Sequence, residues 1–128
     1  MIHVSKNEVP ERILKGRAPR TVFGSTDALF ESHTMTYGYG RFSPDYDLPD
    51  PHVHAEEIIY VVDCKNATIR FGPTEDTMGE PDNLRPGDTL RFDDGEWHVF
   101  GYTDVADGFI DILFFYPSVG NIRPEDNK

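Results

Sequence analysis

Glycine and proline are spread along this chain instead of being gathered in one linker. The sequence contains 11 Gly and 10 Pro, and they separate short runs rich in β-branched and aromatic residues, which are typical of strands. Only segment 8–15 invites a helical interpretation, and Pro10 limits it to a turn or two. The clearest expected strands are 29–42, 58–62, 67–71, 89–92, 98–102 and 109–116. This spacing predicts an all-β sandwich or barrel.

Length and charge narrow the classes of protein further. The 128 residues suffice for one domain with a modest core. Asp and Glu number 23 against 12 Lys and Arg, giving a net charge of -11, so binding to nucleic acid or to an anionic membrane surface is disfavoured. The single cysteine, Cys64, excludes a disulfide scaffold and a thiolate zinc cluster. We see no signal peptide or membrane-length apolar stretch and expect a cytoplasmic protein.

Two of the expected strands contain runs that are apolar on nearly every residue, 58–62 and 110–115. Such runs indicate strands that are buried on both faces. One face must meet the core, and the other is available to a partner subunit.

Segment 35–41 has a different pattern, because large and small residues alternate along it. If the segment is extended, Met35, Tyr37, Tyr39 and Arg41 share one face and small residues share the other. This pattern predicts a cavity wall, with Arg41 as the cation placed to bind a substrate carboxylate.

Histidines and carboxylates gather just ahead of an apolar strand. In the segment PHVHAEE, His52 and His54 point the same way if the backbone is extended. Glu57 or Glu56 can add a carboxylate oxygen, and His98, in the segment DGEWH, can add a third imidazole. The pattern predicts a mononuclear metal site, although a lone His-x-His is more often a solvated surface feature.

These two segments resemble the two motifs of the cupin superfamily of small β-barrels. The first motif is a His-x-His followed by a Glu that opens an apolar strand, which matches His52, His54 and Glu57. The second is commonly Pro-x-Gly-x-x-His, of which Gly95 and His98 match. The resemblance covers most of the chain.

The resemblance implies a cupin-type double-stranded β-helix, a jelly-roll barrel in one domain. The expected organisation is an N-terminal arm that packs on the barrel or on a partner subunit (1–28), the barrel itself (29–120) and a C-terminal tail (121–128). Because single-domain cupins commonly form dimers, the resemblance also implies a homodimer.

The first motif departs from the family pattern in its spacing. Only Ala55 and Glu56 separate its second histidine from Glu57, fewer residues than family members usually have. In an alternative register, Asp50 and His52 take the two histidine positions and His54 is an extra ligand. The favoured set is His52, His54, Glu57 and His98, with Glu56 or Asp50 as the replaceable member. In the second motif, Asp93 stands in place of the usual Pro.

The predicted function follows from these residues and from the resemblance. A site of this kind holds one divalent transition metal ion per subunit, iron, zinc, manganese or nickel, and suits dioxygenase, isomerase, lyase or decarboxylase chemistry on a small polar metabolite. Tyr37, Tyr39 and Glu56 are the candidate proton carriers, and Arg41 is the candidate clamp. The alternatives are a noncatalytic cupin that binds a sugar or effector, and a degenerate cupin without metal.

Overall fold

Strands dominate residues 1–118, the part of the chain that the computed structural model describes. Within these residues the helical elements are four 3-10 turns, and no helix is long and apolar enough to span a membrane. The strands are β1 (Arg17–Gly24), β2 (Phe30–Glu31), β3 (Met35–Phe42), β4 (Glu57–Lys65), β5 (Ala67–Gly72), β6 (Asp82–Asn83), β7 (Thr89–Phe92), β8 (Trp97–Tyr102) and β9 (Phe109–Pro117). The turns are Lys6–Glu8, Pro44–Tyr46, Glu75–Thr77 and Val105–Asp107. The all-β prediction is confirmed.

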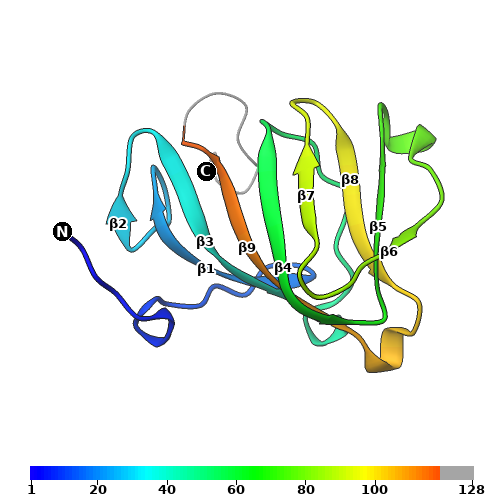
Figure 1. Ribbon diagram of the computed structural model, residues 1–128, viewed down its shortest axis with the longest axis horizontal. Coiled ribbons are helices and arrows are strands. Elements are labelled where there is room, and N and C mark those ends of the chain that lie inside the picture. The colour runs from blue at the N-terminus through cyan, green and yellow to red at the C-terminus, as the bar shows by residue number, and fades with distance from the viewer. Residues whose placement is uncertain (119–128) are drawn as a thin grey trace.

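Two sheets enclose the core. The larger sheet has the order β2-β1-β3-β9-β4-β7, and the smaller has the order β6-β5-β8. Figure 1 shows β3, β9 and β4 side by side in the middle of the molecule, with β8 and β5 on the far side of β7. The buried core residues come from both sheets: Phe42, Ile59, Val61, Ala67, Ile69, Leu84, Phe92, Phe100, Ile110, Ile112, Phe114 and Tyr116.

The N-terminal part of the chain differs from its expected secondary structure. Segment 8–15 is not helical, because the 3-10 turn Lys6–Glu8 ends before Pro10 and the chain then folds back along the start of β1. There Arg12 N donates to Pro19 O and Leu14 N to Arg17 O. Strand β1, in the expected arm, pairs with β3. The expected tail, 121–128, lies outside the described residues.

The expected strand 29–42 is divided into two. Phe30–Glu31 forms the short strand β2, which pairs in parallel with β1, and β3 begins only at Met35. The other expected strands are present with bounds close to those predicted.

The two apolar runs have one face in the core and one face open in the single chain. On β4, Ile59 and Val61 are buried, whereas Ile58, Tyr60 and Val62 are 43%, 41% and 49% exposed. Strand β9 alternates in the same way between buried and half-buried residues. The burial of both faces that the sequence indicated is therefore not present within one chain, because each sheet packs on the core with one face only.

Glycine at position 38 allows β3 to lie close to its neighbours. A Cβ at Gly38 would lie 2.5 Å from Arg20 O and 2.7 Å from Phe114 Cζ. Overpacking of this kind costs about 1–3 kcal/mol. We expect Gly38→Ala to lower the free energy of unfolding, measured by urea denaturation, by that amount.

The matched control is Gly79→Ala, because a Cβ at Gly79 would meet no atom closer than 4.0 Å. Equal losses of stability in the two variants would show that close packing at Gly38 is not the cause.

Candidate metal centre

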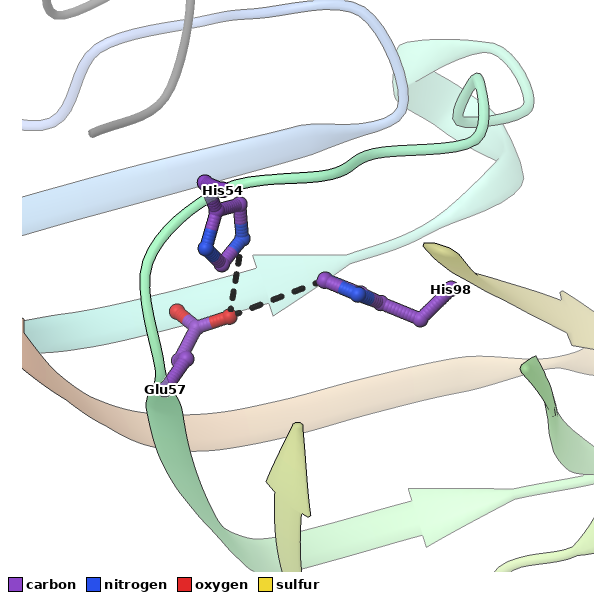
Figure 2. Close-up of side chains that lie close together, drawn as sticks. All are labelled: His54, Glu57 and His98. Carbon is purple, nitrogen blue, oxygen red and sulfur yellow. Dashed lines mark ion pairs between the residues drawn. The ribbon is translucent and has the colours of Figure 1, made fainter. Parts of the chain in front are cut away.

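Three buried side chains converge at one end of the barrel. His54 lies just before β4, Glu57 is the first residue of β4, and His98 lies on β8. Figure 2 shows their side chains pointing toward one another. Glu57 Oε1 lies 3.3 Å from His54 Nε2 and 3.8 Å from His98 Nε2. The three residues are 2%, 1% and 4% exposed in chain order, so the cluster is shielded from solvent.

Backbone carbonyls fix the orientation of both imidazoles. His54 Nδ1 lies 2.7 Å from Ala55 O, and His98 Nδ1 lies 3.0 Å from Glu96 O. A carbonyl oxygen only accepts hydrogen bonds, so each Nδ1 carries the proton and donates it. In the neutral imidazole, Nε2 then presents its lone pair toward Glu57, which is how metal-binding histidines are commonly oriented.

The surroundings of His98 favour its neutral form. Burial lowers the pKa of His98 to about 4, and repulsion from a second proton on His54 and from the Arg17 guanidinium acts in the same direction. The His98 ring also stacks on Phe92, with ring centroids 3.8 Å apart and planes 3° apart. His98 is therefore uncharged and firmly held at neutral pH, the state in which an imidazole binds a metal ion.

The spacing of the three side chains fits a divalent metal ion. Nitrogen and oxygen ligands lie about 2.0–2.2 Å from zinc, so two ligands of one ion are roughly 3–3.5 Å apart. The candidate ligand atoms all lie within 4.8 Å of one another, and two of the three distances are 3.3 and 3.8 Å. The first of these distances already lies in the range of a bound ion, and a shift of a few tenths of an ångström brings the second into it.

A small cavity adjoins the cluster. Its volume is about 20 Å³, room for about one water molecule. Arg17, at the start of β1, is 5% exposed, and its Nη1 lies 3.3 Å from His52 Nε2. The lining residues are Arg17, Phe42, Pro49, His52, His54, Glu57, Ile59, His98, Val99, Phe100 and Ile112.

Comparisons with known proteins identify the architecture. A scan against protein-family models and a search of the curated proteins found no match. Among solved structures, the polyketide cyclase RemF from Streptomyces resistomycificus is similar with a TM-score of 0.69 and 22% identity, over 97% of this chain and 82% of that chain. Fe(II)-HppE gives 0.64 and 11%, over 90% of this chain and 59% of that chain. A variant of the oxalate decarboxylase of B. subtilis gives 0.65 and 18%, over 94% and 31%.

These structural neighbours are cupin proteins. The chain has the cupin fold. It spans most of RemF but less than two thirds of Fe(II)-HppE and of the oxalate decarboxylase. At these identities the likeness describes the barrel, and the chemistry of this protein has to be argued from its own residues.

The cupin barrel brings three of the four predicted metal ligands together. His52 lines the same cavity, but its backbone pairs with His98 and its Nε2 contacts Arg17, so it lies outside the three-residue cluster. Asp50 is exposed and forms an ion pair with Lys15 at 2.9 Å. The structure thus places His54, and not the pair Asp50 and His52, beside Glu57.

Tyr37, Tyr39 and Arg41 of β3 lie on the outside of the cupin barrel, whereas the alternate residues from Thr36 to Phe42 face the core. The prediction that these three residues surround the metal site is therefore wrong. Tyr37 packs on Phe115, with ring centroids 4.9 Å apart. Tyr39 and Arg41 line a different cavity of about 430 Å³ on this outer face, away from the metal cluster.

Glu56 also points away from the cluster. It is exposed, and its Oε2 lies 3.7 Å from Arg91 Nη1 on β7. Successive side chains of an extended segment point to opposite sides, so Glu56 faces solvent because Glu57 faces inward. The four predicted catalytic residues are therefore not gathered at the candidate centre.

The sequence analysis did not identify Arg17 as a residue of the site. The first three residues of β1, Arg17, Ala18 and Pro19, are all buried, so this stretch shows no alternation from which an inward-pointing side chain could be recognised. Arg20, a few residues on, is half-buried and donates to Val9 O. Nothing in the local sequence distinguishes the two arginines.

Proposed function

We propose that the protein is a small metal-dependent cupin enzyme that acts on a small polar metabolite. The observation that carries the proposal is the buried convergence of His54, Glu57 and His98 with both Nδ1 protons held by carbonyls. A divalent metal ion bound there would supply Lewis-acid polarisation of a carbonyl or enolate, and iron would in addition supply dioxygen chemistry.

The residues of the chain position the candidate metal ligands and surround them with a water-poor environment. Glu57 contributes one negative charge to the ligand set, and the two imidazoles contribute none. Apolar side chains of Phe42, Ile59 and Phe100 line the adjoining cavity, which strengthens electrostatic interactions there. The structural neighbours include a cyclase and a decarboxylase, which supports an enzyme of this fold without selecting the reaction.

The test is the metal content of the wild-type protein, purified without a His-tag or chelator and measured by elemental mass spectrometry. We expect about one equivalent of iron, zinc, manganese or nickel per chain, and a lower melting temperature after chelation, because a ligand that binds only the folded state stabilises it. A stably folded wild type that takes up none of these four metals would overturn the proposal and favour a noncatalytic binding cupin.

A further inference from the structure

The positive charge beside the candidate metal centre comes from Arg17. Its side chain is buried, its Nη1 lies 3.3 Å from His52 Nε2, and it lines the same small cavity as His54, Glu57 and His98. The influence of Arg17 on the pKa of His98 agrees with this proximity. An arginine side chain stays protonated even in a protein interior.

The charges around the cavity are balanced only while no metal ion is bound. Among the residues that line it, Arg17 is the only Lys or Arg and Glu57 is the only carboxylate. A divalent ion held by His54, Glu57 and His98 raises the sum of these charges to about +2 in a poorly hydrated space. Buried charge of one sign is costly unless an opposite charge accompanies it, so the loaded centre favours an anionic ligand.

We propose that Arg17 binds the carboxylate of an anionic substrate or ligand at this centre. The inference rests on the proposed function, because the charge excess arises only with the metal ion in place. A guanidinium matches a carboxylate with two parallel hydrogen bonds. The cavity of about 20 Å³ has room for about one water molecule, which is the size of a single carboxylate oxygen, so the smallest carboxylates are the ligands to test.

Arg41 lies too far from the candidate metal centre to bind an anionic ligand there. Arg41 Nη1 donates to both carboxylate oxygens of Asp111, at 3.0 and 2.9 Å, and its guanidinium lies over the Phe109 ring. These contacts hold Arg41 on the outer face of the barrel. Anion binding at Arg17 therefore predicts a loss of affinity in Arg17→Gln, whereas anion binding at Arg41 predicts that loss in Arg41→Gln.

The experiment compares formate with formamide, its neutral analogue of similar size, on zinc-loaded protein. Apparent affinity is obtained from the rise in melting temperature with concentration, and zinc content is measured on the same samples. We expect formate to stabilise the wild type and formamide to have little effect. Arg17→Gln should weaken formate binding at least about tenfold, the scale of a lost charge-assisted hydrogen bond, with zinc content unchanged.

Two further variants make the result specific. Arg17→Lys keeps the charge but loses the planar pair of donors, so its formate affinity should fall between those of wild type and Arg17→Gln. Arg70→Gln is the matched control, because Arg70 lies on β5, is exposed and donates to Gly79 O. It should bind formate as the wild type does.

Several outcomes would overturn the inference. They are formamide binding as tightly as formate, formate affinity unchanged in Arg17→Gln or Arg17→Lys, and loss of affinity in Arg41→Gln instead. If Arg17→Gln does not fold, two measurements still test the inference. One is the comparison of formate with formamide on the wild type, and the other is the formate affinity of Arg17→Lys. Failure of the proposed function looks different, because the wild type then takes up no zinc, whatever Arg17 does to formate binding.

Discussion

His54→Ala and His98→Ala are each expected to lower the affinity for divalent metal more than about 100-fold, whereas His52→Ala should retain about one equivalent. Each of the first two changes removes one of three converging ligands. Even substitution of residues that only orient a metal ligand costs about 10–100-fold, so loss of a ligand itself should exceed that range. Metal titration of chelator-treated protein measures the difference.

The comparison also decides the register of the first motif. In the alternative register, Asp50 and His52 bind the metal, and His52→Ala would then lose it while His54→Ala kept it. The structure favours the opposite result, because Asp50 pairs with Lys15 in solvent and His52 Nε2 contacts Arg17. His33→Ala is the control, since His33 is exposed and pairs with Glu31. All variants should be compared only after their metal-free forms are shown to unfold cooperatively.

The all-β fold and two of the three candidate ligands, His54 and Glu57, were predictable because their signals are local in the sequence. The glycines and prolines separate the strands, and the first motif places His54 and Glu57 within four residues of each other. His98 is distant in sequence, and pairing of β5 with β8 places it in the smaller sheet, where its backbone pairs with that of His52. The motif resemblance anticipated this contact, whereas the composition of the chain did not.

The inward face of β3 was not predictable from its alternation. Alternation shows that two faces differ, but not which of them meets the core. Here the glycines face inward because β9 fills the space beside them. A Cβ at Gly40 would lie 3.2 Å from Ile112 Cγ1, and the Phe114 ring occupies the space beside Gly38. The bulky side chains of β9 are thus accommodated by the small residues of β3.

The position of Arg17 at the cavity was also not predictable from the local sequence. Arg17, Arg20 and Arg41 are all strand arginines with an ordinary local sequence. Only the packing of β1 against β3, which pairs Arg17 with Phe42, places the first of them at the cavity while the other two contact acids or carbonyls outside it. When pairing with a strand distant in the sequence decides whether a side chain reaches the cavity, the local sequence alone does not predict its position.

Stability of the metal-free protein is expected to fall as the pH drops from about 6.5 to about 4. His98 has a folded-state pKa of about 4 against an ordinary value of 6.5. Between these values the unfolded chain binds a proton at this residue that the folded chain does not, so acid favours unfolding. At about 1.4 kcal/mol per pH unit, the difference amounts to about 3 kcal/mol once the pH is well below 4.

The measurement is the free energy of unfolding by urea across this pH range, in the presence of a chelator, for the wild type and for His98→Gln. Carboxylates contribute to the fall in both proteins, so the difference between the two curves isolates the histidine. The wild-type curve should be the steeper one between pH 6.5 and 4, whereas His33→Gln, altered at an exposed histidine, should follow the wild type. Parallel curves for wild type and His98→Gln would show that burial does not suppress protonation of His98, and a metal ion would then have to displace a proton from this imidazole at mildly acidic pH.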